Sequence, residues 1–331
     1  MDAPRTGTIE PFRFADLRRG VEDNQAELLA GLLAARAAIP PKYFYDELGS
    51  RLFAAICCLP EYALTRSEAR IFAEQGEAIA RAAGRGHLLV DLGAGDCGKA
   101  AGLFPLLDPA GYVALDISAD FLRDALGRLK QRFPDLPMTG VAIDFTQSLD
   151  LPEDLLAPAS APRLWFYPGS SIGNFAPDAV HGFLARIARA CAAAPAGGAL
   201  LIGVDLVKDK AVLDAAYDDA LGVTAAFNLN VLNHVNRLLP ADFDVADWRH
   251  VAFFDAAASR IEMHLEARRA VDVRIASKAR RFAAGERIHT EDSYKWTAAG
   301  FGRLLEEAGF MRRKSWQDAE GGFALFLAET S

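Results

Sequence analysis

The chain has 331 residues, of which 51% are hydrophobic and 24% charged, an ordinary composition for a globular protein. Its net charge of −8 argues against nucleic acid as a partner, because proteins that bind the phosphate backbone need a basic surface. At roughly 100–200 residues per domain, the length predicts two domains, or one domain enlarged by an insertion.

Helical spacing is the main pattern in the first part of the chain. Residues 20–37 and 67–84 are rich in Ala, Leu and Glu at helical spacing, and Pro40-Pro41 breaks the chain between them. We therefore expect two helices ahead of the first strand.

Short apolar runs then alternate with helical stretches. The runs are residues 87–93, 112–118, 139–145, 163–169 and 198–207, and the helical stretches lie near 99–107, 119–132 and 177–193. Strands and helices that alternate at this spacing predict an α/β fold with a doubly wound parallel sheet. In such a sheet, ligands bind at the carboxyl ends of the strands.

The alternation stops between about residues 208 and 295. Residues 215–239 have helical character, residues 250–282 resemble antiparallel strands joined by polar turns, and residues 298–329 resume with a helix and two strands. The simplest interpretation is an insertion after the fifth strand of a sheet that the C-terminal segment completes.

The cysteines and the apolar runs indicate where the protein works. Cys57, Cys58, Cys97 and Cys191 show no C-x-x-C spacing, so we expect free thiols of a reducing compartment and neither a zinc site nor a disulfide framework. The N-terminus shows no secretory signal, and no stretch of about 18 uncharged apolar residues is present. These observations predict a cytoplasmic protein that neither contacts a membrane nor binds a metal.

The first turn of the predicted sheet raises the question of the nucleotide. Gly93, Gly95 and Gly98 satisfy the dinucleotide pattern G-x-G-x-x-G, which is a weak signal by itself. Asp116 follows Gly95 by 21 positions, at the end of the second strand, where an acid can bind ribose hydroxyls. These residues fit a binding site for NAD and one for S-adenosylmethionine equally well.

Three further residues favour S-adenosylmethionine. Asp91 lies two residues before the first glycine, where a carboxylate suits a cationic methionine group and fits a pyrophosphate poorly. After the third strand, Asp144 can bind the adenine amine and Phe145 can pack on the base. An NAD-dependent oxidoreductase is the alternative, although no hydride-transfer acid is evident in the sequence.

Eight longer motifs are distributed over the rest of the chain. They are PPKYFYDELGSRLF (40–53), LPEYALTRSEA (59–69), PGSSIGNF (168–175), DLVKD (205–209), AYDD (216–219), VTAAFNLNVL (223–232), RIEM (260–263) and TEDSYKW (290–296). With these motifs, residues 40–331 resemble one family, the S-adenosylmethionine-dependent L-histidine Nα-methyltransferases of ergothioneine biosynthesis.

The resemblance implies an architecture and a reaction. A Rossmann-like methyltransferase domain is expected at residues 67–207 and 296–331, and a smaller α+β substrate domain at 14–66 and 208–295. Three successive methylations of the histidine α-amine would give hercynine, the trimethyl betaine, and S-adenosylhomocysteine. The expected partner is a small-molecule amino acid, and we expect a monomer.

The resemblance also assigns site residues. Carried over by position, the cofactor contacts of the family fall on Gly93, Lys99, Asp116, Asp144 and Phe145, and its histidine contacts on Tyr62, Asn174, Tyr217, Glu291 and Ser293. The turn itself adds Asp91 and Gly95 to the cofactor residues. The sequence departs from the pattern of the family in two places. Ala63 stands where the family often has a second Tyr after the equivalent of Tyr62, and the turn contains Gly-Asp-Cys-Gly.

Several of these side chains have chemical roles that can be stated. Glu291 and Ser293 alternate in an expected extended loop, so both face one side and can bind the two imidazole nitrogens. Asn174 is the catalytic candidate at the sheet edge, where it can hold the substrate carboxylate or amine. Tyr45 is a candidate for hydrogen-bonding the amine and easing its deprotonation, and Met263 for contacting the imidazole.

Other functions stay open from sequence alone. The same family chemistry can act on another aromatic amino acid or on a modified histidine. A non-catalytic small-molecule-binding or scaffold protein descended from the enzyme is a third possibility.

Overall fold

The computed structural model describes residues 12–18 and 20–330. Residues 1–11, which bear on the expected lack of a secretory signal, lie outside this part of the chain. Within the described residues, no helix is long and apolar enough to cross a membrane. The four cysteines are free, as predicted.

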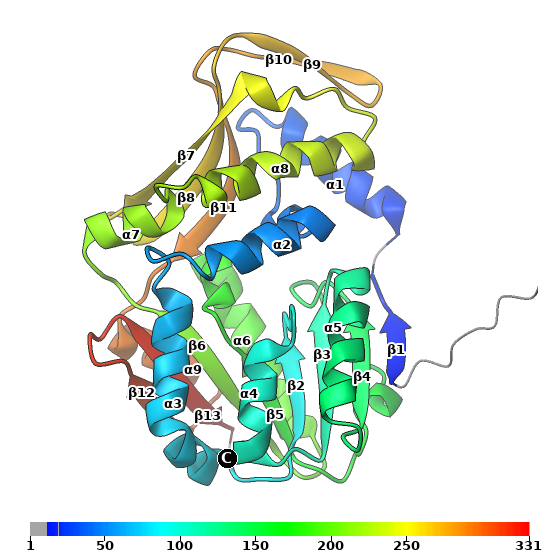
Figure 1. Ribbon diagram of the computed structural model, residues 1–331, viewed down its shortest axis with the longest axis vertical. Helices are drawn as coiled ribbons and strands as arrows, with labels where there is room; N and C mark the ends of the chain where they lie inside the picture. The colour runs from blue at the N-terminus through cyan, green and yellow to red at the C-terminus, as the bar shows by residue number, and fades with distance from the viewer. Residues whose placement is uncertain (1–11, 19, 331) are drawn as a thin grey trace, which may run out of the picture.

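An eight-stranded sheet forms the lower half of the molecule in Figure 1, in the order β1-β4-β3-β2-β5-β6-β13-β12. Strands β1 to β6 are parallel, whereas β13 is antiparallel to β6 and to β12. The bounds are β1 (Arg13–Asp16), β2 (Leu88–Leu92), β3 (Gly111–Asp116), β4 (Met138–Ala142), β5 (Arg163–Tyr167), β6 (Gly198–Asp205), β12 (Arg312–Gln317) and β13 (Phe323–Glu329). The predicted doubly wound α/β fold is confirmed, including its completion by the C-terminal segment.

Helices cover both faces of this sheet (Figure 1). Helices α3 (Leu64–Ala83), α4 (Gly98–Leu107) and α5 (Ala119–Arg132) lie on one face, and α6 (Pro177–Ala193) and α9 (Ala298–Glu307) on the other. Along β2, Leu89 packs in one hydrophobic cluster with Phe104 of α4, whereas Val90 packs in the other with Phe183 of α6. Because both faces are covered, every residue of β2 is buried, which explains why the strand is apolar except for Asp91.

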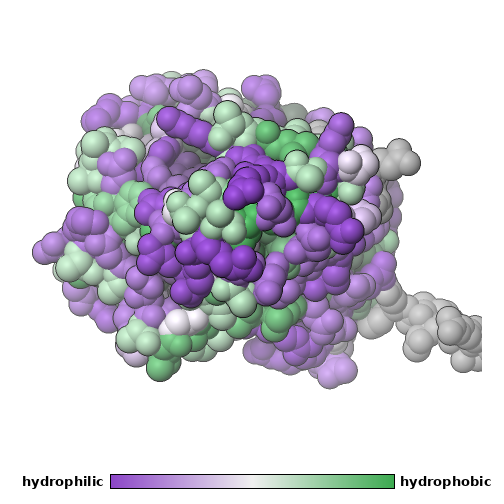
Figure 2. All heavy atoms as spheres, turned by 90° about the horizontal axis from the view of Figure 1, so that it is seen from above, coloured by the Kyte–Doolittle hydropathy of each residue, from purple (hydrophilic) through white to green (hydrophobic). Residues whose placement is uncertain are grey.

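A second, smaller layer lies above the carboxyl edge of the sheet (Figure 1). It contains a three-stranded antiparallel sheet, β11-β8-β7, and a two-stranded one, β9-β10. The bounds are α1 (Val21–Leu33), α2 (Glu47–Ile56), α7 (Lys210–Tyr217), α8 (Val223–Leu238), β7 (Trp248–Asp255), β8 (Arg260–Ala267), β9 (Val271–Ile275), β10 (Lys278–Phe282) and β11 (Arg287–Tyr294). Seen from above, this layer presents mixed hydrophilic and hydrophobic side chains (Figure 2).

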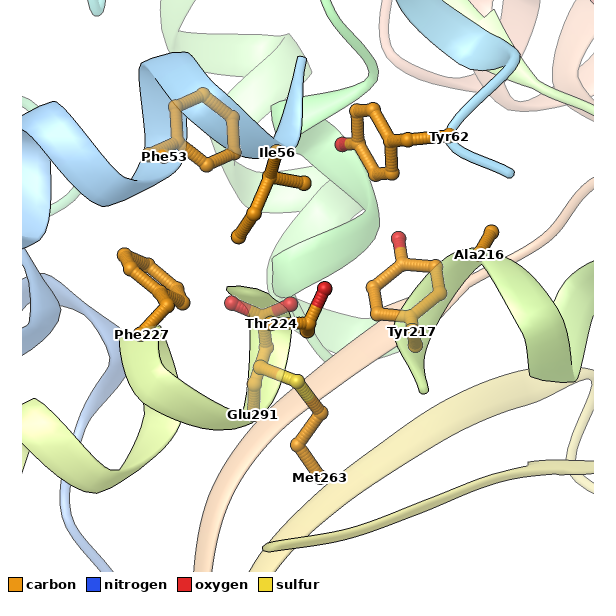
Figure 3. A pocket seen from close by; sticks show the side chains of 9 residues that line it. All are labelled: Phe53, Ile56, Tyr62, Ala216, Tyr217, Thr224, Phe227, Met263 and Glu291. Carbon is orange, nitrogen blue, oxygen red and sulfur yellow. The ribbon is translucent and has the colours of Figure 1, made fainter. Parts of the chain in front are cut away.

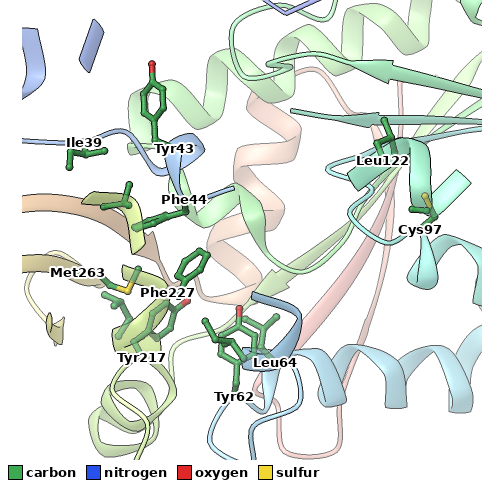
Figure 4. Packing of buried hydrophobic residues seen from close by; sticks show 14 of the residues in the cluster. Ile39, Tyr43, Phe44, Tyr62, Leu64, Cys97, Leu122, Tyr217, Phe227 and Met263 are labelled. Carbon is green, nitrogen blue, oxygen red and sulfur yellow. The ribbon is translucent and has the colours of Figure 1, made fainter. Parts of the chain in front are cut away.

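One hydrophobic cluster joins the two layers (Figure 4). In the upper layer, the rings of Phe44 and Phe227 lie 4.6 Å apart between centroids. The same cluster continues to Cys97 and Leu122 beside the main sheet. The upper layer is therefore held against the sheet edge by apolar packing as well as by the chain connections.

The helical region predicted at 215–239 is interrupted. Gly222 adopts a left-handed φ of 73°, which separates α7 from α8. The Asp219 carboxylate accepts hydrogen bonds from the backbone N–H groups of Val223 and Thr224, at 3.0 and 2.8 Å. These bonds satisfy N–H groups at the start of α8, so a new helix begins there.

Three elements were not predicted. Helix α2 begins at Asp46, whose carboxylate accepts from the backbone N–H of Gly49 at 2.7 Å. The segment carrying Glu291 and Ser293 is strand β11 and not a loop. Strand β1 pairs with β4 in the main sheet, so residues 14–16 do not lie in the upper layer to which the expected substrate domain assigned them. The remaining domain limits stay predictions.

Candidate functional site

The site is built where the strand order of the parallel sheet reverses. Strand β2 pairs with β3 on one side and with β5 on the other, so the loops after β2 and β5 leave the sheet side by side. In open α/β sheets, this switch point is the usual place for a ligand. The upper layer lies over the same edge (Figure 1).

The turn after β2 is a left-handed glycine turn. Gly93, Gly95 and Cys97 have φ angles of 75°, 54° and 61°. The backbone N–H of Gly95 donates to Asp116 Oδ2 at 2.9 Å, and that of Ser118 donates to Asp116 Oδ1 at 2.9 Å. Asp116 therefore holds the turn in shape at the position that was expected to bind a ribose.

Asp91 has an unsatisfied oxygen. Its side chain is buried, and Oδ2 accepts from the Tyr112 hydroxyl at 2.7 Å, whereas Oδ1 has no partner among the described residues. Burial raises the pKa of Asp91 to about 7, against the opposing hydrogen bond from Tyr112. A buried carboxylate oxygen without a partner is costly unless a ligand donates to it. Asp91 thus fits the ammonium group of a methionine moiety.

Lys99 is held by a residue that the sequence analysis did not select. Its Nζ lies 2.6 Å from Glu68 Oε2, and Glu68 Oε1 accepts from the backbone N–H of Gly169 at 2.8 Å. Burial opposes the charge of Lys99, but Glu68 outweighs it and raises the pKa of the ammonium group. Glu68 belongs to the TRSEA segment, where its position in a long helix resembled an ordinary exposed charge.

Asp144 and Phe145 lie after β4. Asp144 Oδ1 accepts from the Thr146 backbone N–H, and Oδ2 forms an ion pair with Lys42 Nζ at 3.1 Å. One oxygen of the Asp144 carboxylate is therefore already paired with Lys42. A Cβ atom placed on Gly93 would lie 3.7 Å from Phe145 Cζ, which brings the ring up to the glycine turn.

A small pocket lies among the elements of the upper layer (Figure 3). It is lined by Phe53, Ile56, Tyr62, Ala216, Tyr217, Thr224, Phe227, Met263 and Glu291. The rings of Tyr62 and Tyr217 meet edge to face with centroids 6.1 Å apart. Met263 of β8 and Glu291 of β11 are register partners on adjacent strands, so both side chains face the pocket. Apolar and aromatic walls with one carboxylate suit a flat ring that carries an N–H group.

Glu291 is the buried charge of this pocket. It is 7% exposed, and its Oε2 accepts a long hydrogen bond of 3.4 Å from Asn174 Nδ2. Burial raises the pKa of Glu291 to about 7, although Lys295 and His289 act in the opposite direction. Near neutral pH the carboxyl group can therefore accept or donate a hydrogen bond.

Ser293 and Asn174 lie behind the pocket wall. The Tyr217 hydroxyl donates to Ser293 Oγ at 2.9 Å, and Lys295 Nζ donates to both oxygens. Asn174 ends the short 3-10 helix Ser171–Asn174, which packs on β11 so closely that a Cβ on Gly173 would meet the Tyr294 carbonyl oxygen at 2.9 Å. The loop after β5 and strand β11 thus position the expected substrate contacts together.

Tyr45 packs in the aromatic wall and does not line the pocket directly. Its ring meets Phe53 and Phe227 edge to face, with centroids 5.7 and 5.9 Å away. Burial raises the pKa of Tyr45 well above its usual range, and the carboxylates of Glu291 and Asp116 raise it further. The hydroxyl stays protonated at neutral pH, so Tyr45 can form hydrogen bonds but is not a base there.

The sequence analysis missed the apolar walls. Phe53 and Phe227 lie on helices, and at helical spacing an inward aromatic residue resembles ordinary core. Lys295 lies in the TEDSYKW motif, but no role was predicted for it, because its burial depends on contacts with residues distant in the chain.

The chain is similar to several known proteins. A family model described as "Histidine-specific methyltransferase, SAM-dependent" matches residues 24–330. A histidine N-alpha-methyltransferase from Mycolicibacterium smegmatis is 41% identical over 317 residues, covering 92% of this chain and 96% of that protein. One from Mycobacterium tuberculosis is 39% identical over 308 residues, covering 91% and 93%. The crystal structure of magnesium protoporphyrin IX methyltransferase from Synechocystis with bound SAH has a TM-score of 0.45 at 11% identity, covering 88% and 98%.

Proposed function

The chain belongs to the S-adenosylmethionine-dependent, histidine-specific methyltransferases, and we propose that it transfers three methyl groups to the α-amine of L-histidine. The products are hercynine and S-adenosylhomocysteine, and the reaction serves ergothioneine synthesis. The observation that carries the proposal is Glu291, a buried carboxylate beside Met263 in an aromatic pocket. A purely apolar ring would leave that carboxylate with only the long hydrogen bond from Asn174, at a substantial energetic cost.

The residues at the sheet edge suit the cofactor. When bound, S-adenosylmethionine supplies an electrophilic methyl group on a sulfonium. The free Oδ1 of Asp91 is available to its ammonium group, and Lys99, held by Glu68, is available to its carboxylate. Asp116 would accept from the ribose, and the left-handed turn at Gly93 and Gly95 leaves room for close approach.

The upper layer suits the amino acid. Glu291 and Ser293, which face the same side of β11, would bind the two imidazole nitrogens, with Met263 against the ring. Tyr217 and Asn174 would hold the carboxylate and the amine, and Tyr62 would close the wall. Methyl transfer needs an in-line approach of an unprotonated amine, so the main contribution of these residues is to fix its orientation.

Asn174 has the central place in this arrangement. It joins the loop after β5 to Glu291 of β11, so it connects the cofactor edge with the amino-acid pocket. Its side-chain oxygen can accept from the substrate amine and direct the nitrogen lone pair toward the sheet edge. Tyr45, which stays protonated, would act on the amine through hydrogen bonding alone.

A methyl-acceptor screen tests the function. Purified protein is incubated with S-adenosylmethionine and one amino acid at a time, and products are weighed by mass spectrometry. Histidine should gain three methylene increments, through one- and two-methyl species. Turnover of tryptophan, tyrosine or a thiolated histidine in its place would contradict the substrate assignment and leave the reaction class intact.

Titration calorimetry separates the other functions. Binding of S-adenosylhomocysteine without binding of NADH supports the methyltransferase, and the reverse would favour an oxidoreductase. Binding without turnover of any acceptor would favour a non-catalytic protein.

We further propose a cytoplasmic monomer that binds neither nucleic acid nor membranes. The free thiols and the net charge of −8 support the cytoplasmic location and the lack of nucleic-acid binding. Light scattering coupled to size-exclusion chromatography would contradict the monomer by showing a dimer mass.

A further inference from the structure

A buried ion pair lies behind the pocket and has no role in the chemistry described so far. Lys295 follows the end of β11, and its side chain is completely buried. Its Nζ lies 3.1 Å from Asp205 Oδ2, at the end of β6 in the main sheet. Asp205 also pairs with Lys208 through its other oxygen. The pair therefore links the upper layer to the sheet edge.

The three ammonium hydrogens of Lys295 are all used. Besides Asp205, Nζ donates to the Tyr217 hydroxyl at 3.0 Å and to Ser293 Oγ at 2.8 Å. An ammonium group has three donors and no acceptor, so it fixes both hydroxyl oxygens as acceptors on that side.

This arrangement constrains the hydroxyl hydrogens. Tyr217 and Ser293 lie 2.9 Å apart and carry two hydroxyl hydrogens, of which only one fits between their oxygens. Neither hydroxyl donates to any other group among residues 12–18 and 20–330. One hydrogen is therefore left to donate to a bound molecule, and Tyr217 lines the pocket (Figure 3).

The charges around Lys295 also bear on the occupant. One carboxylate, Asp205, pairs with two ammonium groups, Lys295 and Lys208, and the Glu291 carboxyl group interacts with Lys295 from the pocket side. Burial opposes the charge of Lys295, but its neighbours Tyr217 and Asp205 raise its pKa, so it stays protonated. A buried ammonium group beside an outward hydroxyl donor favours an anionic acceptor.

We propose that Lys295 is a positioning residue that makes the pocket selective for amino acids with a free α-carboxylate. It fixes the two oxygens of Tyr217 and Ser293 as its acceptors, so that one hydroxyl hydrogen of this pair is directed toward the substrate, and its charge favours the carboxylate over a neutral amide. This inference rests on the proposed function, because it takes an amino acid as the occupant of the pocket.

Binding measurements test the selectivity without relying on turnover. Calorimetry with protein saturated by S-adenosylhomocysteine gives the Kd of histidine and of histidinamide. We expect the wild type to prefer histidine by about tenfold or more, the size of a hydrogen bond to a charged group. A wild type that binds both equally overturns the proposal, with no variant needed.

Variants then assign the preference to Lys295. Lys295→Met keeps the length of the side chain and removes its charge and its donors. The ratio of the Kd of histidinamide to the Kd of histidine should then fall toward one, while the Kd of S-adenosylhomocysteine stays within about twofold. Lys208→Met removes only the distal charge and should cause a smaller loss. Lys278→Met, in the β9–β10 hairpin, is the control and should keep the preference.

Two results separate a structural role from the proposed one. If Lys295→Met weakens histidine and histidinamide by the same factor, Lys295 merely supports the fold and the proposal is wrong. If wild-type protein binds another amino acid and not histidine, the proposed function fails, and the carboxylate preference is measured on that amino acid and its amide. A protein that binds no amino acid contradicts both.

Discussion

The proposed cofactor edge and the proposed amino-acid pocket are built in different ways. At the edge, Asp116 holds the N–H groups of Gly95 and Ser118, so a short stretch of chain and its next strand make the turn. In the pocket, Tyr62, Tyr217 and Glu291 come from three distant segments. Local sequence determines the first region, whereas tertiary packing assembles the second.

Because of this difference, substitutions should change the binding of the cofactor and the binding of the amino acid separately. Backbone groups and strand ends carry most of the edge, so changes there should act on cofactor affinity. Buried side chains carry the pocket, so changes there should act on the amino acid. A variant that changes both the affinity for the cofactor and the affinity for the amino acid would show that the two regions act as one unit. We expect such coupling at the junction at Gly173 and Asn174.

The largest effect is expected for Glu291→Gln. The amide leaves one imidazole contact mismatched in a buried pocket, and we expect kcat/KM for histidine to fall about 100-fold. The Kd of S-adenosylhomocysteine should stay within about twofold. Steady-state kinetics and calorimetry measure both quantities.

Glu262→Gln is the matched control for that variant. Glu262 precedes Met263 on β8, so strand alternation places it on the opposite face of the same sheet. Its kinetics should resemble the wild type. Equal losses in the two variants would mean that sheet stability, and not the pocket carboxylate, explains the effect.

Asp116→Asn should affect the other region. The amide has one acceptor oxygen in place of two, so it cannot hold both N–H groups and bind ribose. We expect the affinity for S-adenosylhomocysteine to fall about 30-fold by calorimetry. Asp120→Asn, exposed in the first turn of α5, is the control. Unchanged affinity in Asp116→Asn would remove Asp116 from the cofactor site.

Gly173→Ala tests the junction between the regions. The new Cβ would lie 2.9 Å from the Tyr294 carbonyl oxygen and 3.3 Å from Ser293 Oγ, so the loop carrying Asn174 must move away from β11. We expect kcat to fall about fivefold to tenfold with little change in cofactor affinity. Gly182→Ala in α6, which has open space, should not change kcat.

The smallest effect concerns the pH dependence of stability. The pKa of Glu291 is about 7 in the folded protein against 4.5 for the free group, so folding keeps a proton that the unfolded chain releases. This contribution to stability is complete below pH 4.5 and is lost as the pH rises toward 7. In the ligand-free protein, Tm should therefore fall across this range, by roughly 5 °C.

Glu291→Gln isolates the contribution of this group. The amide does not titrate, so its decrease in Tm between pH 4.5 and 7 should be smaller than that of the wild type. Asp91, with a pKa of about 7, should account for part of the remaining slope. Identical slopes in wild type and Glu291→Gln would show that Glu291 is solvated in the ligand-free protein.

The sequence predicted the sheet and its glycine turn better than the pocket walls, for a physical reason. Strand alternation and the Gly93 turn are local patterns, and they predicted the sheet, whereas the cofactor roles of Asp91 and Asp116 stay predictions. Helix α2 and strand β11 were missed because their stabilising contacts are long-range. The TEDSYKW segment was selected only by resemblance, since neither spacing nor composition shows that Lys295 is buried against Asp205.

The most direct measurement is a crystal structure of the protein with S-adenosylhomocysteine and L-histidine bound together. We predict the imidazole between Glu291 and Ser293 and the α-amine beside Asn174, facing the sulfur. An imidazole directed away from Glu291, or histidine bound outside the pocket of Figure 3, would contradict the account.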